Sequence, residues 1–234
     1  MHPTQTPLFI FEMANNHQGD VRHGLRIVDE MAKVARRFGI RAAVKLQYRN
    51  LATFIHPDFR TADHKHIKRF LSTELAKEDY ATLVEAIKAA GLVSMCTPFD
   101  EESVQDIVNH GIEIIKVASC SANDWPLLEA IVQARKPIIC STGGLRIEEI
   151  DQVVNLFTHR QVADLSMLHC VGIYPTLNKG VHLNFMDTMK RRYHWLPVGY
   201  SGHEAPDNYD VVQAAMAKGA RILERAFERV GGRP

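Results

Sequence analysis

The segment PLFIFEMANNHQGD, residues 7–20, joins a short apolar run directly to a cluster of acidic, amide and imidazole side chains. Residues 7–13 have the length and the aromatic and aliphatic content of a buried strand. In parallel α/β folds, chemistry collects at the carboxyl ends of such strands. The segment therefore predicts a strand that ends at Glu12, followed by a polar loop that contains Asn16 and His17.

The same unit recurs along the chain. Amphipathic helical patterns, such as residues 23–39 and 77–91, alternate with apolar runs typical of strands buried on both faces. Eight such strands in one domain, residues 1–234, predict a closed (β/α)8 TIM barrel, and a doubly wound open sheet is the alternative. The seven runs after the first span residues 41–47, 91–97, 112–118, 136–142, 164–170, 196–201 and 220–227.

Two regions depart from a regular barrel. Only ERVGGRP, residues 228–234, follows the eighth run, so we expect the barrel to lack its last helix. Residues 48–76 are basic and aromatic and too long for a plain turn. This segment is either a small packing helix or a lid, and the sequence does not decide between the two.

Composition narrows the classes of partner. The 234-residue chain has a formal net charge of +1, which favours a small-molecule partner over nucleic acid or a membrane surface. It has no apolar run near the roughly 20 residues of a membrane span and no signal-peptide pattern at its start, so we expect a cytoplasmic protein. Four cysteines each close an apolar run, and we expect them to be reduced and buried.

Lys45 and Lys116 lie inside apolar strands, where a lysine without a partner is rare and costly. Together with strand-end hydroxyls they predict a site for a phosphate or carboxylate. The alternative is that each lysine pairs with an internal acid, such as Glu12 or Glu224, and only stabilises the barrel. A Schiff-base aldolase that uses one of the two lysines is a further hypothesis.

Seven segments, in chain order, resemble the motifs of the sialic acid synthases, which make N-acetylneuraminate and related nonulosonates from phosphoenolpyruvate. Any one of these matches is weak, but the ordered series on successive strands indicates homology. The segments are FEMANNHQGD, VKLQ, CTPFD, IIKVASCSAND, KPIICSTGG, LHCVGIYPT and VGYSGHE.

The resemblance implies a condensation of phosphoenolpyruvate with the aldehyde of an N-acylated hexosamine, such as N-acetylmannosamine, with release of phosphate. It implies catalytic roles for Glu12, Lys45 and Lys116, and a divalent ion, manganese or magnesium, held by His203. It also implies a cytoplasmic homodimer. The substrate-binding positions that it implies are Asn16, His17, Gln47, Thr97, Phe99, Ser119, Ser141, Tyr174 and Ser201.

Four features depart from the family's pattern. Ala226 stands where the family has its second metal-binding histidine, so we expect metal binding to be weak. Ser121 replaces a strand-four acid, for which Asp124 is a candidate substitute, and Gly172 replaces an asparagine or serine. We also expect the family's C-terminal antifreeze-like domain to be absent. The alternative function is therefore a catalytically impaired or truncated barrel that keeps an anion pocket without turnover.

Overall fold

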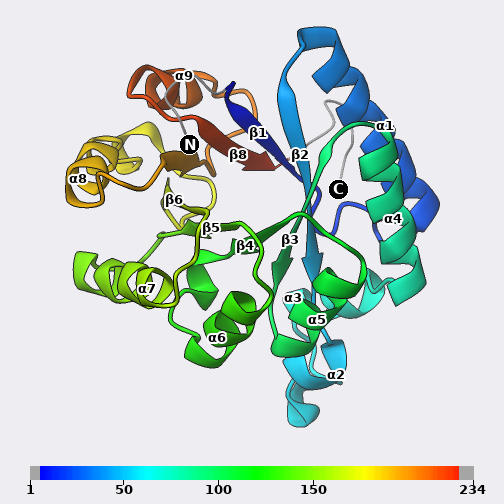
Figure 1. Cartoon of the computed structure of the whole chain (residues 1–234). Helices are drawn as coiled ribbons and strands as arrows, with labels where there is room; N and C mark the ends of the chain where they lie inside the picture. Colours follow the sequence, from blue (N-terminus) through cyan, green and yellow to red (C-terminus); the bar gives the residue numbers. More distant parts are fainter. Residues whose placement is uncertain (1–5, 227–234) are drawn as a thin grey trace.

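Eight parallel strands form a closed barrel in the computed structural model, which describes residues 6–226 (Figure 1). The first strand pairs with both the second and the eighth, so the predicted TIM barrel is confirmed and the open sheet is wrong. The strands are β1 Leu8–Glu12, β2 Arg41–Tyr48, β3 Val93–Pro98, β4 Ile114–Val117, β5 Ile138–Ser141, β6 Leu165–Cys170, β7 Val198–Ser201 and β8 Ile222–Ala226.

Helices surround the barrel and connect consecutive strands (Figure 1). The prediction that the barrel lacks a helix after β8 concerns residues beyond Ala226, which lie outside the described residues. Among residues 6–226, no helix combines the length and apolarity needed to cross a membrane. The helices are α1 Val21–Phe38, α2 Leu51–Phe54, α3 Lys65–Ser72, α4 Lys77–Ala89, α5 Glu101–Asn109, α6 Trp125–Gln133, α7 Ile147–His159, α8 Asn184–Arg192 and α9 Asp210–Ala217, with 3-10 turns at Pro57–Phe59, Ser119–Ser121 and Asn178–Gly180.

The start and end of α1 follow from its sequence. Asp20 precedes the helix and caps it, because its side chain accepts a hydrogen bond of 2.8 Å from the backbone N–H of Arg22. Gly39 ends the helix in a left-handed conformation, with φ of 58°, where glycine carries no steric penalty. These caps fix the direction in which the chain leaves β1 and returns to β2.

The barrel interior is divided into an apolar floor and a polar mouth. Side chains two residues apart on a strand share a face, so each floor residue predicts an inward-facing residue closer to the carboxyl end. Ile10 is thus followed by Glu12, and Ile114 by Lys116. The floor is a separate buried cluster of Leu8, Ile10, Ala43, Met95, Ile114, Ile139, Leu168 and Ile222.

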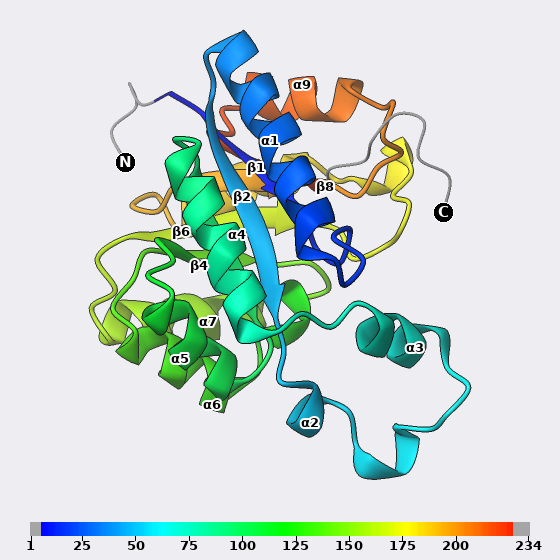
Figure 2. The same cartoon turned by 90° about the vertical axis from the view of Figure 1, so that its right-hand side faces the viewer.

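A lobe of residues 49–76 leaves the carboxyl end of β2 and extends away from the barrel, as Figure 2 shows. It contains α2, the turn Pro57–Phe59 and α3, and none of these elements has a fully buried residue. The segment is therefore a protruding structure and not a tightly packed helix of the barrel wall.

The four cysteines are free thiols. Cys96, Cys140 and Cys170 are buried as expected, but Cys120 is exposed, so that part of the expectation is wrong. The reason is local: Cys120 lies in the turn Ser119–Ser121 after β4, beyond the strand whose apolar run suggested burial.

Gly199 in β7 allows the barrel to close tightly. A Cβ atom at this position would lie 2.3 Å from the backbone oxygen of Ile222 and 2.7 Å from a methyl carbon of Leu168. Backbone atoms of β8 cannot move away without disturbing the β7–β8 pairing. We predict that Gly199→Ala lowers the free energy of unfolding by about 3 kcal/mol or more, measured by denaturant unfolding.

Gly172→Ala is the matched control, because a Cβ atom there would meet no atom within 4 Å. It should change the free energy of unfolding by less than about 0.5 kcal/mol. Equal stability of the two variants would contradict the steric role of Gly199.

Candidate active site at the mouth of the barrel

Two acids, one buried and one mostly buried, flank Lys45. Its Nζ forms ion pairs with the carboxylates of Glu12 and Glu224, the latter at 3.0 Å. Burial alone would lower the pKa of Lys45, but the two carboxylates outweigh it and raise that pKa. Lys45 therefore follows the alternative reading of the lysines: it is paired internally and charged, and it links β1, β2 and β8.

Lys116 is in a different situation, although it is only 2% exposed. Its Nζ lies 3.8 Å from Glu224, beyond hydrogen-bond range, and donates instead to Ser141 Oγ at 2.7 Å and to the Val117 carbonyl at 3.2 Å. Burial lowers the pKa of Lys116, and Glu224 offsets this only in part. Lys116 is thus the cation at the mouth that an incoming anion can pair with most directly.

Hydroxyl groups lie around these charges. Ser119 Oγ accepts a hydrogen bond of 2.8 Å from the Gly143 backbone N–H, and a Cβ atom on Gly143 would come within 3.0 Å of that hydroxyl. Ser201 Oγ donates to Glu224 at 2.8 Å. Thr97 Oγ1 is buried without a hydrogen-bond partner within residues 6–226. An unpaired buried hydroxyl is costly, so a ligand that pairs with Thr97 gains affinity.

Hydrogen bonds to Val171 and Tyr174 orient the His203 ring. Its Nδ1 donates to the Val171 carbonyl at 2.8 Å, so Nε2 carries the lone pair of the neutral ring. That lone pair accepts from the Tyr174 hydroxyl at 2.8 Å, and the two rings stack with centroids 3.9 Å apart. Burial lowers the pKa of His203, which favours the neutral ring.

These residues do not fit a tightly held divalent ion. The lone pair that His203 would offer is occupied by Tyr174, and Ala226, the register partner of Glu12, has no donor atom. Over the described range 6–226, no group of three or more histidine, cysteine, aspartate or glutamate side chains is arranged to hold a metal. We therefore assign no step of the chemistry to a metal.

The loop after β1 separates two of the predicted substrate contacts. Asn16 is exposed in a turn, where its backbone N–H donates to the Met13 carbonyl at 3.0 Å. His17 is 1% exposed, and its ring contacts the ring of Tyr80 edge-on, with centroids 6.0 Å apart. Burial lowers the pKa of His17 to about 4, so this ring is neutral near pH 7.

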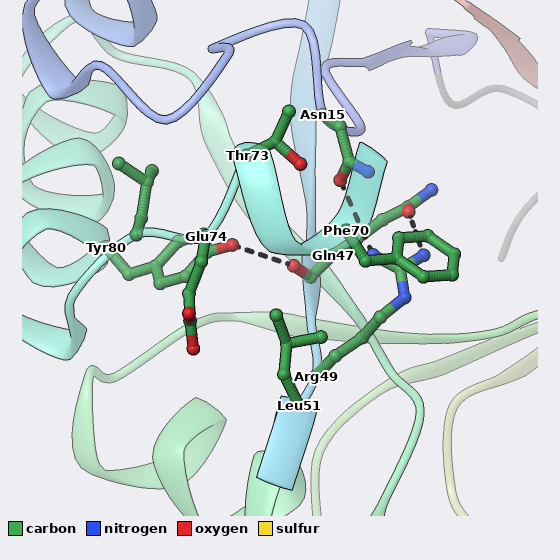
Figure 3. Close-up of a pocket in the computed structure, with 9 residues that line it drawn as sticks. Asn15, Gln47, Arg49, Leu51, Phe70, Thr73, Glu74 and Tyr80 are labelled. Atoms are coloured by element: carbon green, nitrogen blue, oxygen red, sulfur yellow. Dashed lines mark hydrogen bonds between the residues drawn. The ribbon is translucent and has the colours of Figure 1, made fainter. Parts of the chain in front are cut away.

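Gln47 lies beside a residue that the sequence reasoning missed, Arg49. Figure 3 shows the Arg49 guanidinium next to the side chains of Asn15 and Gln47, with Phe70 above it. Phe99, a predicted substrate contact, lies against the same guanidinium, 4.1 Å from the ring centroid. The alternation Lys45–Gln47–Arg49 along and just beyond β2 is the signal that could have predicted Arg49.

Asp124, the candidate substitute for the missing acid, has a structural task. Its side chain accepts a hydrogen bond of 3.2 Å from the Leu127 N–H and caps α6.

Comparison with known proteins identifies the family of the chain. A model of the NeuB family matches residues 31–229. The chain belongs to the NeuB family. As a NeuB-family barrel it is similar to a Chromobacterium violaceum protein assigned to spore coat polysaccharide biosynthesis (protein E), with 47% identity, a TM-score of 0.91, and coverage of 95% of this chain and 67% of that one.

A second solved structure, N-acetylneuraminic acid (sialic acid) synthetase from Leptospira borgpetersenii in complex with citrate, is 28% identical, with a TM-score of 0.83 over 95% of this chain and 73% of that one. The N-acetylneuraminate-9-phosphate synthase of Drosophila melanogaster is 29% identical over 93% of this chain and 59% of its own length. The present NeuB-family chain thus spans about three fifths of that relative.

We predict that two substitutions create a firm metal site. Ala226→His adds an imidazole opposite Glu12, and Tyr174→Phe frees the Nε2 lone pair of His203. The double variant should bind Mn²⁺ on the order of tenfold or more tighter than the parent chain, measured from the electron paramagnetic resonance signal of free Mn²⁺.

The control variant combines Ala226→Leu with Tyr174→Phe, since leucine adds volume without a donor. It should bind Mn²⁺ more weakly than the histidine variant. If the parent chain already binds Mn²⁺ as tightly as the histidine variant, this would contradict the conclusion that its residues do not fit a tightly held divalent ion.

Proposed function

We propose that this chain condenses phosphoenolpyruvate with the aldehyde of an N-acylated hexosamine to form a sialic acid or a related nonulosonic acid, and releases phosphate. The single observation that carries the proposal is Lys116, a buried cation beside hydroxyls and outside hydrogen-bond range of its nearest carboxylate. Membership of the NeuB family and the synthases among its relatives support the reaction class.

Phosphoenolpyruvate brings a carboxylate and a phosphate to this mouth. Lys116, Ser119 and Ser141 form its binding surface in the proposal, with Thr97 gaining the partner that it lacks. The Gly143 N–H orients the Ser119 hydroxyl and Ser141 holds the buried lysine, so the hydroxyl and the lysine are positioned to stabilise the charge of the leaving phosphate. The Leptospira relative binds citrate, another small polyanion, which agrees with such a surface.

Glu12 accepts a proton from the attacking water in the proposed reaction. C3 of phosphoenolpyruvate bonds to the aldehyde carbon, and the aldehyde oxygen takes up a proton and becomes a hydroxyl. Water adds at C2 and gives one proton to Glu12. The bond from C2 to the phosphate oxygen then breaks, so that C2 becomes a ketone and phosphate leaves with the remaining proton. Burial raises the pKa of Glu12, while Lys45 works against that shift. A carboxylate with a raised pKa is a competent proton acceptor for the attacking water. Gln47 and Tyr174 are proposed to contact the sugar.

We predict that Lys116→Gln lowers the affinity for phosphoenolpyruvate on the order of 30-fold or more, measured by calorimetric titration, because a buried charged partner of the anion is lost. Lys33→Gln, an exposed lysine on α1, is the matched control and should leave that affinity unchanged. If neither the parent chain nor the control binds phosphoenolpyruvate, the proposal fails.

We predict that Glu12→Gln retains phosphoenolpyruvate binding but lowers phosphate release on the order of 100-fold or more with a panel of N-acylhexosamines. The amide keeps the shape of the carboxylate but cannot accept the proton. Normal turnover by this variant would remove Glu12 from the proton transfer.

The alternative function, an anion-binding barrel without turnover, is favoured by Ala226 and by the closed Tyr174–His203 pair. It predicts that the parent chain binds phosphoenolpyruvate and releases no phosphate with any acceptor. Measurable release by the parent chain rejects this alternative. A covalent lysine adduct trapped by borohydride with pyruvate would instead support the Schiff-base aldolase hypothesis.

A further inference from the structure

Arg49 lies among three aromatic rings at the junction of the barrel and the lobe. Its guanidinium carbon is 4.1 Å from the ring centroid of Phe99, 4.7 Å from that of Phe70 and 5.8 Å from that of Phe54. The rings come from the barrel loop after β3, from α3 and from α2. They fix the plane of the guanidinium and exclude water from its faces.

The guanidinium has hydrogen-bond acceptors but no counter-ion. It donates to the Gln47 side-chain oxygen and, at 3.4 Å, to the Asn15 side-chain oxygen (Figure 3). Its Nε is buried and has no hydrogen-bond partner within the described part of the chain. No carboxylate of residues 6–226 pairs with Arg49, and burial lowers its pKa. A partly buried cation without an anion is an expensive arrangement that an anionic ligand relieves.

The acids nearby do not fill this role. Glu12, whose charge acts on Arg49, is already paired with Lys45. Glu74 lines the same pocket as Arg49 but forms no ion pair with it. The surrounding segment, residues 49–72, contains five lysines and arginines and only Asp58 and Asp63 as acids. Asp63 is paired with Lys68 at 2.5 Å. Glu102 and Asp106, which line a second pocket beside Arg49, are paired with Lys77.

We propose that Arg49 is an anion-recognition residue for the acceptor, and that the acceptor sugar carries an anionic substituent, a phosphate ester or a carboxylate, at the end away from its aldehyde. This rests on the proposed function, because it places the acceptor between the buried lysines and the lobe. Arg49 and Gln47 then bind different parts of the acceptor. The Arg49 guanidinium pairs with the anionic substituent. The Gln47 oxygen is engaged by Arg49, which leaves its amide N–H groups to donate to the sugar.

The relatives differ in the charge of the product for which they are named. The Drosophila relative is named for a phosphorylated product, whereas the Leptospira relative is named for a product without phosphate. For the present chain, the unpaired guanidinium favours the charged class.

The test measures binding, so it does not depend on turnover. Wild type is saturated with phosphoenolpyruvate and titrated calorimetrically with N-acetylmannosamine, with its 6-phosphate and with the corresponding 6-carboxylate. We expect at least one charged acceptor to bind tenfold or more tighter than the neutral sugar, and the two charged arms distinguish a phosphate from a carboxylate. Equal affinity for all three would overturn the inference.

Arg49→Gln should remove that discrimination, so that charged and neutral acceptors bind within about threefold of one another. Because Arg49 also holds Gln47, the variant can change the affinity for the neutral sugar. The ratio of charged to neutral affinity isolates the effect of the charge. An unchanged ratio in Arg49→Gln would overturn the inference.

Lys65→Gln is the matched control, since it removes one positive charge from the same lobe at an exposed position outside the aromatic rings. It should preserve the ratio, and a loss equal to that in Arg49→Gln would assign the effect to the general charge of the lobe and overturn the specific role. Arg49→Lys keeps the charge without the fork and should lose part of the discrimination. It decides the matter if Arg49→Gln fails to fold.

A titration with phosphoenolpyruvate alone distinguishes a failure of the proposed function from a failure of the role proposed for Arg49. A wild-type chain that does not bind phosphoenolpyruvate contradicts the proposed function. A chain that binds it and also binds the neutral sugar as tightly as the charged ones contradicts only the role of Arg49.

Discussion

The ion pairs of Lys45 with Glu12 and Glu224 are the constraint on which the rest of the structure depends. The three residues lie on β2, β1 and β8, which are the strands at the closure of the barrel. A buried charge set is tolerated only if each member has a partner, and loss of one member leaves an uncompensated charge. The same pairing that helps to close the barrel also fixes the acid that is proposed to accept a proton. Stability and chemistry are coupled at this point.

The sequence predicts the barrel well because its strands are buried on both faces, so that the apolar runs are continuous and easy to separate from amphipathic helices. The two-residue period then places Lys45 and Gln47, and equally Glu12 after Ile10, on the inner face. What the period cannot show is how charges pair across strands. The two lysines differ in this respect: Lys45 lies within hydrogen-bond distance of two carboxylates, whereas Lys116 lies 3.8 Å from Glu224.

The loops account for most of what the sequence did not reveal. Cys120 is exposed because it lies in the turn that follows a strand. Tyr174 forms a hydrogen bond with His203 from a loop, and a loop has no periodic pattern from which this contact could be predicted. The Arg49 guanidinium contacts aromatic rings from three separate segments, and these segments come together only when the chain folds. Contacts of this kind depend on the tertiary arrangement, and a pattern of spacing within one segment does not predict them.

The apolar floor of the barrel has a consequence for the order of binding in the proposed reaction. Eight side chains close the lower end, so reactants and products pass through the mouth alone. In the proposed reaction phosphoenolpyruvate lies deeper, against Lys116, and the sugar lies above it near Gln47 and the lobe. The deeper reactant then has to enter first, because the sugar would block its path, and steady-state rate patterns should show this obligatory order. Because this barrel opens only at its mouth, the depth at which each reactant binds along the barrel axis sets the order in which the reactants bind.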